Sequence, residues 1–212
     1  MGFEKSSDAL IRLFYFCVGF TPIALLATAL MGFVPLHWSV FLLIPVLGIV
    51  ALVAMEYPRQ FRLALWGIGA GMVATLVYDT TRWPFVLMGM WPDFIPKIGA
   101  ALWNSGHGHW ISGYLWRYFG NGGGMGLAFV MAAPWIAQRI DVRKGAILYG
   151  TAIWCCLLGT LYMCPDAHRM MFDLTPLSFV VSLVGHWVYG AALGLIVYYS
   201  QSTGSRVAAP SA

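Results

Sequence analysis

Ionisable side chains interrupt several long apolar runs of this sequence, and they are the first candidates for chemistry. Asp79 and Arg82 are three residues apart, so on a helix they would share one face and could form an ion pair. Arg117 lies well inside another apolar run, where it needs a carboxylate, a cluster of carbonyls or an anionic ligand. Asp79 and Asp166 are its natural partners. An alternative is that Asp79 and Arg82 only stabilise a helix end at the membrane interface.

The histidines suggest a second kind of chemistry, the binding of haem or a metal ion. His109 and His186 occupy matching positions in a repeated motif, and paired histidines on facing helices can hold haem, copper or zinc. The thioethers of Met163 and Met170 nearby would suit copper(I). The alternative for a histidine in a span is a hydrogen bond to a neighbouring helix. No compact H-E-x-x-H or C-x-x-C motif accompanies these histidines.

Two sets of candidate residues follow from these patterns. The predicted ligand-binding set is Asp79, Arg82, Arg117, His109 and His186. The candidate metal set is His107, His109, His168, His186, Asp166 and Cys164. Motifs of soluble catalysis such as G-x-S-x-G and the Walker loop are absent, so no motif supports enzyme activity, and the sequence leaves open whether the protein is an enzyme.

The composition shows which kind of protein must position these residues. Of the 212 residues, 60% are hydrophobic and only 9% are charged, whereas a soluble domain carries about 25% charged residues. A soluble enzyme, a nucleic-acid-binding protein and a disordered chain are therefore excluded as classes. We expect an all-α, polytopic transmembrane helix bundle that forms a single domain over residues 1–212 and has the lipid bilayer as its surroundings.

Apolar runs of about 20 residues predict where the chain crosses the bilayer. Six are expected, at residues 13–31, 38–55, 63–79, 107–137, 145–163 and 177–200. The run 107–137 would be about 45 Å long as one helix, and a turn at Gly120–Gly122 would instead give seven spans. A short amphipathic surface helix is expected at 93–104, and a flexible tail at 201–212.

The distribution of Lys and Arg favours six spans over seven. With six spans and a cytoplasmic N-terminus, the inner segments hold eight of the 12 basic residues, whereas seven spans divide them six against six. The inner eight are Lys5, Arg12, Arg59, Arg62, Arg139, Arg143, Lys144 and Arg206. We therefore expect both termini in the cytoplasm of a cell with a bacterial-type inner membrane, and all five histidines in the outer half.

Two segments with the pattern G-H-W-[IV]-x-G indicate an internal repeat. They are Gly108–Gly113 and Gly185–Gly190, and a D-x-x-P motif precedes each, at Asp93–Pro96 and Asp173–Pro176. We interpret this as a two-helix unit, spans three and four, repeated as spans five and six. Pairs of the form G-x-x-x-G on spans three, four and six predict close helix packing.

The last predicted span resembles a broad group of small, uncharacterised bacterial polytopic membrane proteins. The shared ending is H-x-x-Y-G-x-x-x-G, here His186-Trp-Val-Tyr-Gly190 followed by Gly194. The resemblance implies a small helical inner-membrane protein and assigns no catalytic residue.

Three functions remain open from the sequence. The first is an accessory or structural subunit of a larger membrane complex, whose partners are other membrane subunits or further copies of the chain. The second is transport or binding of a small solute or a lipophile such as a quinone, lipid or carotenoid. The third is a redox subunit that binds haem or copper through the outer histidines.

Overall fold

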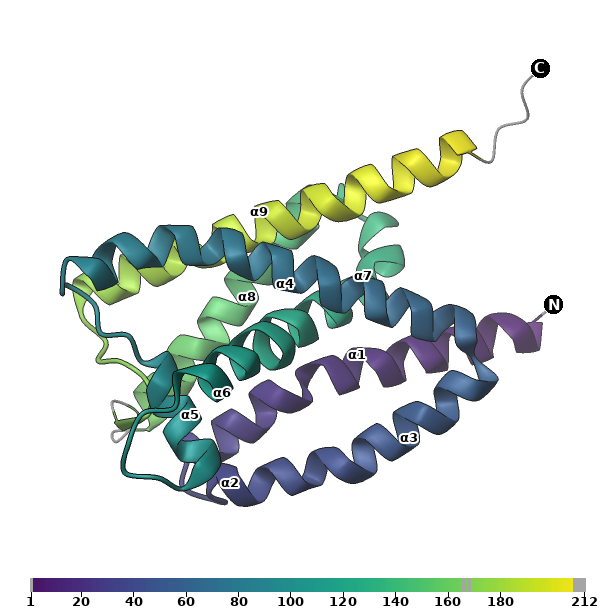
Figure 1. The fold of residues 1–212 in the computed structure, drawn as a ribbon. Helices are drawn as coiled ribbons and strands as arrows, with labels where there is room; N and C mark the ends of the chain where they lie inside the picture. The colour runs from purple at the N-terminus through teal and green to yellow at the C-terminus, as the bar shows by residue number, and fades with distance from the viewer. Residues whose placement is uncertain (1, 165–166, 168, 208–212) are drawn as a thin grey trace.

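The chain folds into a helical bundle (Figure 1). The computed structural model describes residues 2–164, 167 and 169–207, with the backbone alone for 2–6 and 201–207. Every regular element in these ranges is helical. The long helices are α1 (Gly2–Leu30), α3 (Leu43–Glu56), α4 (Pro58–Leu87), α7 (Gly124–Ala137), α8 (Val142–Met163) and α9 (Pro176–Val207). The short elements are α2 (Leu36–Ser39), the 3-10 turn η1 (Val40–Leu42), α5 (Ile95–Trp103), α6 (Trp110–Leu115) and the π-helical segment η2 (Trp116–Gly123).

Five of the helical stretches are long and apolar enough to cross a membrane. They are Ser7–Leu30, Leu36–Glu56, Pro58–Leu87, Val142–Met163 and Pro176–Ser200. Each of them overlaps one of the predicted apolar runs. A multi-pass membrane protein is the architecture that these helices fit.

The segment 107–137 was expected to form either one long helix or two helices with a turn at Gly120–Gly122. Helix α6, η2 and α7 follow one another without a break from Trp110 to Ala137. The backbone therefore does not turn at Gly120–Gly122, and the alternative of two separate helices there is wrong. A short helix, α5, overlaps the predicted segment 93–104, and its residues Ile95 and Ile98 are buried in an apolar cluster. Helix α9 extends to Val207, so residues 201–207 are helical, although a flexible tail was expected.

The helices follow one another up and down, so that the basic segments gather at one end. Helix α8 packs along α9, α9 along α4, α4 along α7, and α7 along α1. The start of α1, the α3–α4 junction, the α7–α8 junction and the end of α9 lie at the same end (Figure 1). We call this the arginine-rich end; the basic residues there whose side chains are described are Arg12, Arg59, Arg62, Arg139, Arg143 and Lys144. The opposite end, which holds α5, is the α5 end.

Glycines bring α4 and α7 into backbone contact. A Cβ atom on Gly126 would collide with the backbone of Gly67 and Gly71, and one on Gly71 would collide with the carbonyl oxygen of Gly122. Such close approach is how helices associate in lipid, where apolar burial supplies no drive between them. The contact brings the π-helical segment against α4, which positions the candidate site.

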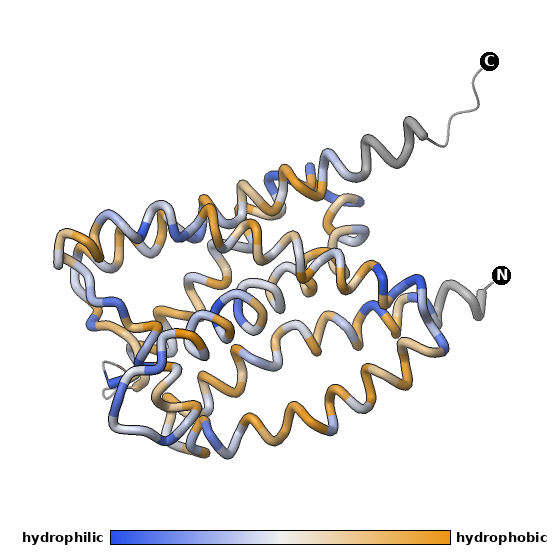
Figure 2. The backbone as a smooth tube through the Cα atoms, in the orientation of Figure 1, coloured by the Kyte–Doolittle hydropathy of each residue, from blue (hydrophilic) through white to orange (hydrophobic). Residues whose placement is uncertain are grey.

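Helix α3 lies at the edge of the bundle and buries none of its own residues. Its neighbours are α4 and η1, and its exposed apolar side chains include Ile44, Leu47, Leu52 and Met55. Figure 2 shows an almost continuous hydrophobic tube along α3, with hydrophilic residues concentrated at the two ends of the bundle. A helix that is apolar all round suits a lipid environment.

Candidate functional site

Asp79 on α4 is the central acceptor of a buried polar network. The residue is 1% exposed, yet its carboxylate accepts hydrogen bonds from three side chains. The Nε of Arg117 lies 3.0 Å from each carboxylate oxygen, and an Nη of Arg117 also donates to Oδ1. The hydroxyl of Tyr118 donates to Oδ2 at 3.0 Å, and Arg82 Nε lies 3.4 Å from Oδ1. Arg117 therefore has one of the two partners that the sequence suggested.

Arg82 extends the network to a second carboxylate. It is fully buried at 0% exposure, and its Nη1 donates to Asp93 Oδ1 at 3.1 Å. Its Nη2 donates to the hydroxyl of Tyr114 at 3.2 Å, and that hydroxyl in turn donates to Asp93 Oδ2 at 3.1 Å. Asp79, Arg82, Asp93, Tyr114, Arg117 and Tyr118 together are called the ion network below.

Aromatic rings cover the faces of both guanidinium groups. The Cζ of Arg117 lies 4.8 Å from the ring centre of Tyr78, and that of Arg82 lies 5.6 Å from the rings of Trp83 and Phe94. A cation above an aromatic ring is attracted by the ring quadrupole, most strongly where water is excluded. The rings therefore help to replace the solvation that each arginine loses on burial.

The π-helical segment carries Arg117 and Tyr118 to the side of α4. A π turn closes with i→i+5 hydrogen bonds, and such segments are frequent at functional sites. Here Gly122, one turn beyond Arg117, packs against the side chain of Thr75 on α4, where a Cβ atom would not fit. The Gly122 carbonyl also accepts a hydrogen bond of 2.9 Å from the Tyr189 hydroxyl on α9. The glycines thus allow the widened turn to approach both helices.

The two histidines of the predicted ligand-binding set lie in different surroundings. His186 on α9 is 8% exposed; its Nδ1 lies 2.7 Å from the Ser182 carbonyl, and its ring is 5.3 Å from that of Tyr78. His109 is exposed at the start of α6, with its ring 6.3 Å from that of Trp103. His186 therefore adjoins the ion network through Tyr78, whereas His109 does not take part in it.

The structure does not assemble the candidate metal set. Among the described residues, no group of three or more His, Cys, Asp and Glu side chains could hold a metal ion. Cys164 is buried in an apolar cluster and His107 is exposed in the loop before α6. Asp166 and His168 lie outside the described residues.

Asp93, Tyr114 and Tyr118 are members of the site that sequence reasoning missed. Tyr114 and Tyr118 stand three residues before and one residue after Arg117, so a helix can direct all three toward one neighbour. That spacing is the signal that could have identified the tyrosines. Asp93 belongs to a D-x-x-P motif and begins the predicted surface helix, but no spacing in the sequence connects it to Arg82.

The ion network is chemically self-contained. Two aspartates and two arginines give it a formal charge of zero, and each carboxylate oxygen accepts at least one hydrogen bond. A buried charge is tolerated when it is paired and hydrogen-bonded, and losing one partner leaves the other uncompensated. The arrangement stabilises the packing of α4 against the π-helical segment and α5.

A comparison with known families places this network in a wider group of proteins. Residues 61–207 match the model of a family of unknown function, DUF6789, and the match covers more than half of the chain. The chain belongs to the DUF6789 family. All residues of the ion network lie inside the matched segment, whereas α1 to α3 precede it. No curated protein and no solved structure matches the chain.

Proposed function

We propose that this DUF6789 protein is an accessory or structural subunit of a larger assembly in a bacterial-type inner membrane. One observation carries the proposal: the ion network pairs its own charges, and its two central residues, Asp79 and Arg82, are at most 1% exposed. A site that must bind and release a solute needs polar groups that the solute can reach. The lipid-facing surface is then the part of the molecule that remains available for function.

The same proposal includes six membrane crossings. Five are the long apolar helices, and α6, η2 and α7 together form one more, which is the fourth in chain order. This continuous helix of Trp110–Ala137 is about 42 Å long, enough to span a hydrocarbon core of roughly 30 Å. It runs from the α5 end to the arginine-rich end, as an up-and-down order requires. The arginine-rich end faces the cytoplasm by the positive-inside rule.

An internal repeat is supported by a shared packing detail. In the first copy, Gly99 approaches the carbonyl of His109, and Gly113 approaches that of Ile95. In the second copy, Gly150 approaches the carbonyl of His186, and Gly190 approaches that of Ala146. Both helix pairs are antiparallel, and in each pair the close contacts involve the histidine and the last glycine of the G-H-W motif. The helix that packs against the motif is α5 in one copy and α8 in the other, so this detail relates α5 to α8 and does not extend to the third predicted span, which is α4.

Native membranes provide the direct test of the subunit proposal. The protein is solubilised in a mild detergent and its mass is measured by native electrophoresis and cross-linking. We expect a complex well above the 23.4 kDa chain, and loss of that complex when Leu47 and Leu52 on α3 are replaced by polar residues. The matched control replaces two exposed apolar residues of α8, Leu148 and Met163, in the same way. A protein that always migrates as a monomer would contradict the proposal.

A further inference from the structure

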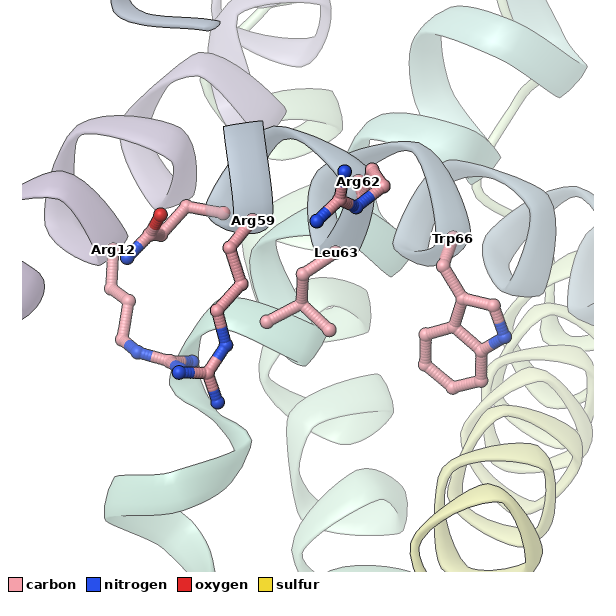
Figure 3. Close-up of a pocket in the computed structure, with 6 residues that line it drawn as sticks. Arg12, Arg59, Arg62, Leu63 and Trp66 are labelled. Atoms are coloured by element: carbon pink, nitrogen blue, oxygen red, sulfur yellow. The ribbon is translucent and has the colours of Figure 1, made fainter. Parts of the chain in front are cut away.

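A pocket rich in arginine opens at the arginine-rich end, away from the ion network. It has a volume of about 320 Å³ and is lined by Arg12 from α1 and by Arg59, Gln60, Arg62, Leu63 and Trp66 from α4. Figure 3 shows the guanidinium groups of Arg12 and Arg59 meeting in this view, with Leu63 next to Arg59 and with Arg62 and Trp66 farther along α4. The lining thus contains three cations and no acidic residue.

The charges of this pocket are only partly compensated. Asp8 accepts hydrogen bonds of 2.8 Å from Arg12 Nε and from Gln60, so it neutralises one arginine. Arg59 and Arg62 form no ion pair with any side chain that the structure describes. The Nη1 of Arg12 is buried and has no hydrogen-bond partner among the described residues. Clustered guanidinium groups of this kind match the geometry of a phosphate.

An apolar groove continues directly from the arginines. A second pocket of about 380 Å³ shares Arg12, Leu63 and Trp66 with the first one. Its other lining residues come from α7 and α9 and are mostly apolar: Val130, Ala133, Pro134, Val197 and Ser200. A ligand that filled both pockets would place an anionic group among the arginines and an apolar chain between α4, α7 and α9.

We propose that these two pockets form one binding site for an anionic phospholipid, with its phosphate held by Arg12, Arg59 and Arg62. The inference rests on the membrane location in the proposed function. The positive-inside rule places this end at the cytoplasmic leaflet, where anionic lipids concentrate and where basic pockets between helices bind their headgroups. The apolar groove selects a lipid over a free phosphate ion, because a free ion has no group to fill it.

Lipid binding to the isolated chain tests this inference. Full-length protein in detergent is titrated with dioleoyl-phosphatidylglycerol, and bound lipid is counted by native mass spectrometry. The double variant Arg59→Gln/Arg62→Gln should raise the Kd by about 25-fold, at about fivefold for each arginine. Both arginines are exposed, so their replacement leaves the packed interior unchanged.

The matched control removes the same charge from the same end. Arg139→Gln/Lys144→Gln replaces two exposed basic residues that do not line either pocket, and it should change the Kd by less than about twofold because of salt screening. Equal losses in both double variants would overturn the inference, since they would indicate diffuse attraction to the whole basic end. An unchanged Kd in Arg59→Gln/Arg62→Gln would also overturn it.

Two further binding measurements distinguish a phospholipid from a free phosphate ion as the ligand. Phosphatidylcholine with the same acyl chains should bind more weakly, and inorganic phosphate in large excess should not displace phosphatidylglycerol. Displacement by inorganic phosphate would overturn the lipid assignment in favour of a simple anion site. Because the titration uses the purified chain, its result does not depend on whether the protein joins a larger assembly.

Discussion

At the scale of single residues, the interior of this protein depends on charges that compensate one another. Asp79 faces two arginines, Arg117 and Arg82, whose guanidinium groups are covered by aromatic rings. Removing Asp79 leaves Arg117 without its counter-charge, while Arg82 keeps its ion pair with Asp93; removing Asp79 and Arg117 together leaves Arg82 and Asp93 as a balanced pair. The effects of substitutions in the network on the free energy of unfolding should therefore be non-additive.

Asp79→Asn should destabilise the protein by about 3–5 kcal/mol, because it leaves a buried cation unpaired. The double variant Asp79→Asn/Arg117→Gln should cost less than the sum of the single variants, by about 1–3 kcal/mol. The measurement is unfolding in detergent micelles, with exposed Thr80→Ala on the same helix as the control. Additive single effects would show that the pair is energetically independent.

Sequence reasoning predicted part of this site for a physical reason. A cation inside an apolar run must have a counter-charge, so Arg117 pointed to a carboxylate, and Asp79 was one of two choices. The connection from Arg82 to Asp93 could not be predicted, because it depends on how the loop before α5 folds back onto α4. The pocket arginines were interpreted only as an orientation signal, since Arg12 is far from Arg59 in sequence and the groove between them forms on folding.

At the scale of helices, α4 packs closely against α7 because glycines at the contact have no Cβ atom. Gly71→Ala should destabilise the bundle by about 1–3 kcal/mol, because the added methyl group would meet the backbone at Gly122 and Gly126. Gly69→Ala on the same helix is the control, since nothing lies near its Cβ position, and a better helix former should leave stability unchanged or raise it. Thermal unfolding in detergent distinguishes the two.

Helix α8 begins with a cap that should respond to acid. Hydrogen bonds from Arg143 lower the pKa of Asp141 from 3.8 to about 2, and its carboxylate also accepts from the Arg143 backbone N–H at 2.9 Å. A carboxyl whose pKa is lowered on folding stabilises the folded state above its unfolded pKa. That stabilisation should be lost as pH falls from about 4 to about 2. Asp141→Asn should remove this part of the pH dependence of unfolding.

The sequence predicted the positions of the long helices but not the π-helical segment within one of them. A helix that crosses a bilayer needs about 20 mostly apolar residues, so the five long apolar helices could be predicted from the sequence. The π-helical segment could not, since its widened turn is stabilised by the contacts that Gly122 makes with α4 and α9. The sequence showed only that Gly120–Gly126 was rich in glycine.

At the scale of the whole molecule, the separation of the basic end from the α5 end makes an orientation testable. Ser105→Cys at the α5 end should react with a membrane-impermeant maleimide added outside the cell, whereas Arg139→Cys should react only after lysis. The four native cysteines are first replaced by serine or alanine. Labelling of Arg139→Cys in intact cells would reverse the proposed orientation.

The zero net charge of the ion network has a consequence for a protein in an energised membrane. A transmembrane voltage acts on each elementary charge with about 2.3 kcal/mol per 100 mV. Two aspartates and two arginines held together as one unit experience opposing forces that cancel. If the protein spans an energised membrane as proposed, a voltage therefore exerts no net force on the ion network, and collapse of the voltage should leave the packing of α4 against the π-helical segment unaltered.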